Sequence, residues 1–130
     1  MPDWVLTCVL LATGGAVGTL SRYWLGRLVV ELQQARWPGI EFPFGTFLIN
    51  MSGSILLGFL AVLCAEPSRR SYYLLLGTGF CGGFTTFSTF SLETFEMLRD
   101  GRLAHALIYA LGSVAAGVLG VWCAMRMMGK

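Results

Sequence analysis

The amino-acid sequence predicts an all-α integral membrane protein with four transmembrane helices, the third of which is broken at its middle. Its 130 residues are 55% hydrophobic and only 12% charged, whereas soluble proteins carry about 25% charged residues. The apolar residues gather in four stretches, and each is long enough to supply the ~20 residues that cross a bilayer. Adjacent glycines and a run of hydroxyl side chains interrupt the third stretch.

We expect a single integral membrane domain over residues 1–130. Its helices should cover residues 4–30, 42–65, 71–97 and 103–126, with a break in the third helix near residues 82–86. The second stretch has no Asp, Glu, Lys, Arg or His, and the third has none before Glu93. The first follows Asp3 rather than a basic cluster and is too long for a signal peptide, so we expect it to be retained.

Charge and cysteine content argue against several function classes. A net charge of +2 is too small to indicate nucleic-acid binding. The four cysteines lie singly in apolar segments, which favours small buried hydrophobic side chains over a zinc site or a disulfide framework. The sequence contains no evident nucleophile–base pair or metal-ligating cluster, so we do not expect an enzyme.

Basic residues give no clear membrane orientation. Each side of the predicted bundle receives the same number of them, namely Arg69, Arg70, Arg126 and Lys130 on one side and Arg27, Arg36, Arg99 and Arg102 on the other. An excess in cytoplasmic loops normally sets the topology. Either Arg27 belongs to its helix and a weak bias remains, or the chain inserts both ways and two copies pair upside-down. Polar residues in the spans must face protein or water, which also favours a partner subunit.

The first helix combines a packing motif with a basic residue. Gly14 and Gly18 form a G-x-x-x-G spacing that allows close contact between helix backbones. Arg22 lies about 27 Å along the helix from Trp4, near the far membrane interface. It either snorkels to that interface or places a positive charge at a pore mouth.

The second and fourth helices each carry a polar stripe. Thr46, Asn50 and Ser54 are four residues apart and share one face. Asn50 either makes an interhelical hydrogen bond that specifies packing or presents a donor to a solute. In the fourth helix, a partly polar ridge of Tyr109, Ser113 and Gly117 runs beside a ridge of small residues at Gly112, Ala116 and Gly120.

Glycines weaken the middle of the third helix. Each glycine costs about 1 kcal/mol relative to alanine at a helix position, and this segment has four, at 77, 79, 82 and 83. Broken backbone persists in a membrane only where it is buried in protein or lines a cavity. Its free carbonyls suit a cation, whereas the N–H groups of the following half-helix suit an anion.

Aromatic rings and hydroxyls follow the break. Phe87 and Phe90 are three apart and share a face, with Ser88 and Thr89 between them. Because the edge of an aromatic ring is positive, ring edges, hydroxyls and the Asn50 amide form an uncharged donor path that suits an anion. The alternative is that the rings only pack and the hydroxyls bond back to their own helix.

Three motifs resemble those of the CrcB or Fluc fluoride channels. They are GGAVGTLSRY at 14–23, FGTFLINMSGSILLG at 44–58 and GFCGGFTTFSTFSLE at 79–93, and the resemblance covers essentially the whole chain. It implies an antiparallel, dual-topology homodimer that passes several times through the cell (inner) membrane, in contact with lipid. It also implies a fluoride-selective channel that exports fluoride passively from the cytoplasm and so reduces fluoride toxicity.

The resemblance further implies roles for individual residues. The ring edges of Phe87 and Phe90 would face the ion, and backbone carbonyls of Gly82 and Thr85 from both subunits would hold a structural sodium ion (Na+) at the dimer centre. The other pathway residues would be Asn50, Thr46, Ser88, Thr89, Tyr109 and Ser113, with Arg22 and Glu93 at the vestibule. Gly117 departs from the pattern, since some members carry a serine there.

Two other functions fit parts of the sequence. A small proton-coupled multidrug-type exporter would share the size and the dual topology. It needs a membrane-embedded carboxylate, and Glu93 is the nearest, toward a helix end. A non-transporting membrane assembly protein would explain the glycines and Asn50, but it would not explain a helix break lined with donors.

Overall fold

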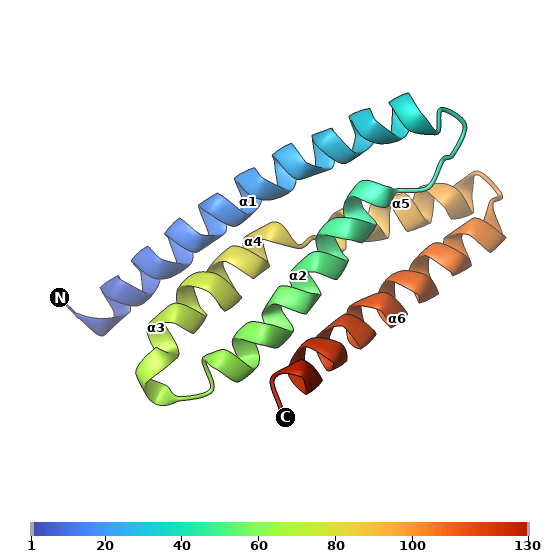
Figure 1. The fold of residues 1–130 in the computed structure, drawn as a ribbon. Helices are drawn as coiled ribbons and strands as arrows, with labels where there is room; N and C mark the ends of the chain where they lie inside the picture. The colour runs from blue at the N-terminus through green and yellow to red at the C-terminus, as the bar shows by residue number, and fades with distance from the viewer. Residues whose placement is uncertain (1, 130) are drawn as a thin grey trace.

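Four helical spans pack side by side in the computed structural model, which describes residues 2–129 (Figure 1). Three spans are unbroken helices: α1 (Asp3–Arg36), α2 (Phe44–Leu63) and α6 (Leu103–Met127). The third span is assembled from η1 (Pro67–Arg69), α3 (Arg70–Tyr72), the π-helix η2 (Tyr73–Cys81), α4 (Gly82–Phe84) and α5 (Phe87–Arg99). The predicted all-α fold with an interrupted third span is therefore confirmed.

The first helix is longer than its apolar stretch. The sequence predicts an end near residue 30, but α1 continues to Arg36. Its last residues, ELQQAR, are mostly strong helix formers, and they continue the helix although they are polar. Trp37 then leaves the helical region, with φ −139° and ψ 67°, because a residue before a proline is pushed away from the α conformation.

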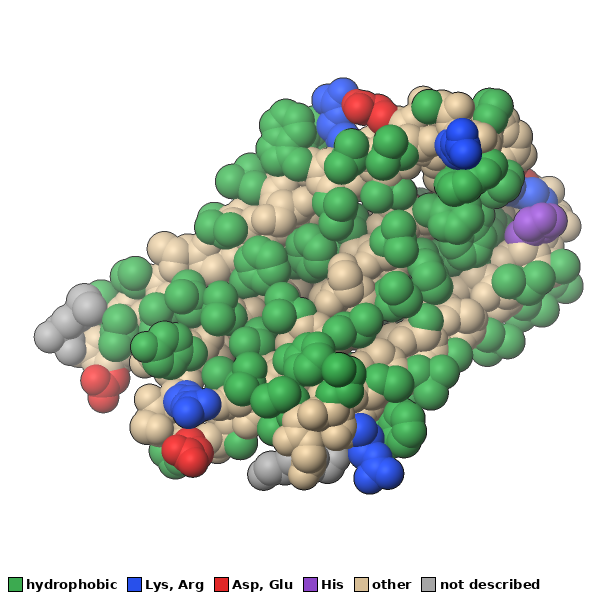
Figure 2. Space-filling model, in the orientation of Figure 1, with side chains coloured by type: hydrophobic (Ala, Val, Ile, Leu, Met, Phe, Trp, Pro, Cys, Tyr) green, Lys and Arg blue, Asp and Glu red, His purple; other side chains and the backbone are tan. Residues whose placement is uncertain are grey.

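The outer surface is that of a membrane protein. The three unbroken helices are each long and apolar enough to cross a bilayer. On the face shown in Figure 2, hydrophobic side chains cover the middle and the charged side chains lie toward the two ends. Large apolar residues such as Ile108 and Leu111 are 68% exposed, which suits contact with lipid or a second protein.

Glycines bring α1 into backbone contact with the third span. Gly14 and Gly18 are buried. A Cβ atom added at Gly14 would overlap the Leu75 carbonyl oxygen, and one at Gly18 would overlap the carbonyl oxygen of Phe80. The close contact predicted from the G-x-x-x-G spacing is therefore confirmed, and its partner is η2.

The break lies within the predicted residues 82–86, but the glycines do not cause it. Gly82 is helical, with φ −63° and ψ −38°, and the glycines before it lie inside η2. The chain instead becomes extended at Thr85 (φ −81°, ψ 159°) and Thr86 (φ −147°, ψ 113°). β-Branched residues tolerate extended backbone well, so the threonines form the break, while Gly79 and Gly83 allow close packing on α1.

The break lets the third span change neighbours. Before it, η2 and α4 pack mainly against α1; after it, α5 packs against α6. The extended residues pass behind α2 in the view of Figure 1. On its other side α2 packs closely on α6, where a Cβ atom at Gly58 would lie 3.0 Å from the Cβ atom of Ala124. The second helix thus lies against both halves of the broken span.

Two adjacent glycines of α1 offer a matched test of this packing. We expect Gly14→Ala to lower the free energy of unfolding by about 1–3 kcal/mol, the usual cost of overpacking, because its Cβ atom would meet backbone. Gly15→Ala should have little effect, since its Cβ atom would lie 3.8 Å from the nearest atom, the Gly79 carbonyl oxygen. Thermal unfolding in detergent micelles measures both. Equal melting temperatures for the two variants would contradict the close contact.

Candidate functional site

A side-chain amide from α2 is paired with the backbone of the break. The Asn50 Nδ2 group donates to the Thr86 carbonyl oxygen over 3.0 Å, and the Thr86 N–H donates to Asn50 Oδ1 over 2.8 Å. The amide therefore supplies both hydrogen bonds that Thr86 loses by leaving the helix. Of the two alternatives for Asn50, the structure shows the interhelical bond. Because Nδ2 carries two hydrogens, this bond leaves one N–H for a further acceptor.

Arg22 and Thr19 cap the half-span that precedes the break. The Gly83 carbonyl oxygen accepts from Arg22 Nε over 3.1 Å and from Thr19 Oγ1 over 3.4 Å. The C-terminal end of a helix is electronegative and lacks internal donors, so a guanidinium group stabilises it. The side chain of Arg22 thus reaches across to the third span, which the sequence alone did not indicate.

Thr86 begins the half-span that follows the break. Its Oγ1 atom accepts from the Thr89 N–H over 3.2 Å and donates to Thr89 Oγ1 over 3.0 Å. Ser88 Oγ lies 3.3 Å from the same oxygen. This is an N-cap, and Thr86 is a site residue that the sequence analysis missed. The signal was a threonine directly before the amphipathic segment FSTFSLETF.

Glu93 joins predicted residues from two other helices. Its Oε1 atom accepts from Thr46 Oγ1 over 2.7 Å, and its Oε2 atom accepts from the Tyr109 hydroxyl over 2.6 Å. Thr46 and Tyr109 are only 8% and 1% exposed. All three residues are predicted from the sequence but their grouping is not, because they come from α5, α2 and α6 and lie up to 63 positions apart.

A row of aromatic rings runs beside these polar groups. The centroids of Phe87 and Phe90 are 5.9 Å apart, and those of Phe90 and Tyr109 are 5.2 Å apart. Phe42 meets Tyr109 edge to face at 5.5 Å. Phe87, at the other end of the row, is 79% exposed. The shared face predicted for Phe87 and Phe90 is confirmed.

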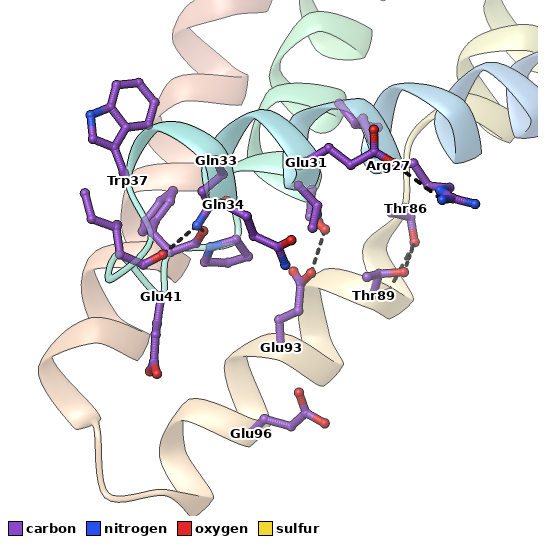
Figure 3. Close-up of a pocket in the computed structure, with 18 of the residues that line it drawn as sticks. Arg27, Glu31, Gln33, Gln34, Trp37, Glu41, Thr86, Thr89, Glu93 and Glu96 are labelled. Atoms are coloured by element: carbon purple, nitrogen blue, oxygen red, sulfur yellow. Dashed lines mark hydrogen bonds and ion pairs between the residues drawn. The ribbon is translucent and has the colours of Figure 1, made fainter.

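Two cavities meet at the break. The larger, of about 1270 Å³, is lined by Arg22, Thr46, Thr86, Thr89 and Glu93 together with residues near its rim. Figure 3 shows Glu93 extending from α5 into this cavity, with Thr86 and Thr89 bonded to each other at its side. At the rim, Arg27 pairs with Glu31 over 3.4 Å and Arg102 pairs with Glu41 over 2.6 Å.

The smaller cavity, of about 500 Å³, lies on the other side of Thr86. Its lining includes Asn50, Gly82, Thr85, Thr86 and Phe87. Thr86 lines both cavities, so it lies between them. Arg22 and Glu93 belong only to the larger cavity, and no Asp, Glu, Lys or Arg lines the smaller one.

The two predicted serines, Ser113 and Ser88, differ in burial. The Ser113 Oγ atom is buried and has no hydrogen-bond partner among residues 2–129. A buried hydroxyl without a partner is costly, and Ser113 lines neither cavity. Ser88 is exposed on α5.

The Asn50–Thr86 pair makes a prediction for stability. Asn50→Leu keeps a similar size but leaves the N–H and carbonyl groups of Thr86 without partners. We expect the free energy of unfolding to fall by about 2 kcal/mol or more. Ser52→Ala, on the same helix, is the control, because Ser52 bonds only to the Leu48 and Ile49 carbonyls of its own helix. Denaturant unfolding in micelles with no difference between the variants would argue against the pair.

Comparison with known proteins identifies the family. The family described as "CrcB-like protein, Camphor Resistance (CrcB)" matches residues 9–125. A protein of Chlorobium phaeobacteroides is 37% identical over 98% of this chain and 96% of its own length. Proteins of Novosphingobium aromaticivorans and Gloeobacter violaceus are 44% and 45% identical over 91% and 88% of this chain and 92% and 89% of their own lengths. All three bear the name "Fluoride-specific ion channel FluC". The chain therefore belongs to the CrcB-like protein family.

Proposed function

We propose that this chain is a fluoride-selective ion channel that lets fluoride leave the cytoplasm passively and so lowers fluoride toxicity. The observation that carries the proposal is the relationship, over nearly the whole chain, to proteins named fluoride-specific ion channels. The chemistry of the site is consistent with it. Uncharged hydrogen-bond donors converge at a break in a membrane span, and no basic residue lines the smaller cavity.

Fluoride is a small anion that holds water tightly, so a channel must replace that water with close donors. The second N–H of Asn50 and the unpartnered hydroxyl of Ser113 are available for this purpose. The ring edges of Phe87 and Phe90 add weak positive charge. Because all of these groups are neutral, they stabilise the ion without trapping it. Conduction requires sites that an ion can both enter and leave.

The larger cavity would serve as the vestibule. Arg22 contributes a positive charge beside the break, while the arginines at the rim are already paired with carboxylates. Glu93 is bonded to two hydroxyls, which partly compensates its negative charge on the path of an anion. A proton-coupled exporter would need this carboxylate to exchange protons, and the transport assay below separates the two functions.

We further propose that the channel is an antiparallel homodimer in the inner membrane. Phe87, a proposed pathway residue, is 79% exposed in a single chain, and such a ring faces lipid unless a second subunit covers it. The equal distribution of basic residues between the two sides favours insertion in both orientations. Cysteines introduced at opposite ends of the bundle would cross-link only in an antiparallel pair.

A sodium ion at the break is compatible with the residues present. The helical partner of the Gly82 carbonyl would be the Thr86 N–H, but that group donates to Asn50. Among the described residues, no backbone hydrogen bond outside the helices ends on the Gly82 or Thr85 carbonyl. Both residues line the smaller cavity. Two carbonyl oxygens from each subunit would thus supply the oxygen ligands that hard cations prefer.

Transport in liposomes tests the proposed function. We expect the purified chain to release fluoride from loaded liposomes without ATP or a proton gradient, as measured with a fluoride electrode. Release should follow the fluoride gradient alone, since the chain offers a passive path. Leakage no faster than from protein-free liposomes would refute the channel, and release only with an opposing proton gradient would favour the exporter.

The ring edges make a second prediction. We expect Phe87→Ile and Phe90→Ile each to reduce fluoride efflux by about tenfold, the effect of losing roughly 1.4 kcal/mol of stabilisation. Phe95→Ile is the matched control, because Phe95 lies on the same helix and is 59% exposed but does not belong to the row of rings that contains Phe87 and Phe90. The same efflux from all three variants would rule out a specific role for the two rings.

A further inference from the structure

The smaller cavity extends well beyond the break. From Asn50, Thr86 and Phe87 it continues along η2 as far as Tyr73 and Gly77, with Ser54 and Leu57 of α2 on its other wall. It is therefore continuous with the pathway residues of the proposed channel. The residues at this far end have no part in the pathway described above.

The ring of Tyr73 lies along the cavity in the space that a side chain at position 77 would occupy. A Cβ atom at Gly77 would lie 3.0–3.3 Å from three atoms of the Tyr73 ring, so the ring lies over the glycine. Tyr73, Gly77 and Cys81 are four residues apart and all line the cavity. They lie in a π-helix, a rare structure with wide turns that is frequent at functional sites. The π-helix therefore presents Tyr73, Gly77 and Cys81 to the same cavity.

The hydroxyls of Tyr73 and Ser54 are free donors. Several hydroxyls of the described helices bond back to the carbonyl four residues earlier, as at Thr7, Ser52 and Ser91. Neither Tyr73 nor Ser54 makes any side-chain hydrogen bond within residues 2–129, although both are half-buried. By contrast, Tyr109, which lines neither cavity, donates its hydroxyl to Glu93. The two free hydroxyls are thus available to a ligand.

Ser54 also connects this end to the fourth helix. Its Oγ atom lies 3.4 Å from the position that a Cβ atom of Gly117 would occupy. Gly117 is one turn beyond Ser113, whose buried hydroxyl lacks a partner. The donors that line this end, Ser54 and Tyr73, therefore come from two different spans, while Ser113 lies one turn away on the third and lines neither cavity. The carbonyls proposed for sodium lie at the break, whereas the far end of the cavity offers the hydroxyls of Ser54 and Tyr73 and no charged side chain. These donors suit a small monovalent anion.

We propose that the Tyr73 and Ser54 hydroxyls form a further halide-binding position, on the side of the break away from Glu93. This inference rests on the proposed channel function and extends its pathway. An ion that leaves Asn50 and Phe87 would exchange those donors for the two hydroxyls before it reaches water. Tyr73 is then a residue that determines how readily fluoride passes this end of the cavity.

Fluoride efflux from liposomes tests the position with a matched pair of tyrosines. Tyr73→Phe removes only the hydroxyl and keeps the ring over Gly77. We expect about tenfold slower efflux and a higher half-saturating fluoride concentration, because a hydrogen bond to a charged group is lost. Tyr72→Phe removes the same atom from the neighbouring residue, which is 63% exposed and lines neither cavity. It should match the unmodified chain.

A second pair of variants tests Ser54. Ser54→Ala should slow efflux in the same way as Tyr73→Phe, while Ser52→Ala should not, since the Ser52 hydroxyl is already bonded to its own helix. Unchanged efflux and half-saturation in both Tyr73→Phe and Ser54→Ala would overturn the inference. Equal slowing in Tyr72→Phe would overturn it too. Failure of the proposed function is distinct, because the unmodified chain itself would then release no fluoride.

Discussion

The double hydrogen bond between Asn50 and Thr86 is the interaction on which the rest of this structure depends. A break in a membrane span exposes backbone groups that lipid cannot satisfy. Asn50 satisfies both groups of Thr86, while Arg22 and Thr19 satisfy Gly83 on the other side. With the break fixed, the third span can pack first on α1 and then on α6. This crossing places Glu93 and Phe90 next to Tyr109.

The same interaction explains how an apolar bundle presents a polar path without charge at its centre. Helix formation normally consumes every backbone donor and acceptor. The break releases some of them, and α5 starts there with its electropositive end. Ionised groups line only the larger cavity, where Glu93 is hydrogen-bonded and the arginines at the rim are paired with carboxylates. The smaller cavity offers amide, hydroxyl and aromatic groups and no charged side chain, which suits an anion that must also leave.

The fold could be predicted from the sequence because lipid imposes strong rules on length, polarity and charge. The four spans, the interrupted third helix and the contact at Gly14 and Gly18 all followed from local patterns. The cause of the break could not be predicted from these patterns, because glycine weakens a helix only where no neighbouring helix packs on it. Here α1 packs on Gly79 and Gly83, and the backbone stays helical through Gly82. The grouping of Thr46, Glu93 and Tyr109 was also unpredictable, since it depends on how three helices cross.

The most direct test of the central claim is whether fluoride touches the neutral donors at the break. Nuclear magnetic resonance of the Asn50 side-chain amide and the Thr86 backbone amide, recorded during a fluoride titration with chloride as the control, measures this contact. The account predicts a saturable shift of the Asn50 resonance with fluoride and a much smaller one with chloride. Fluoride transport that proceeds while the Asn50 amide shows no response would contradict it.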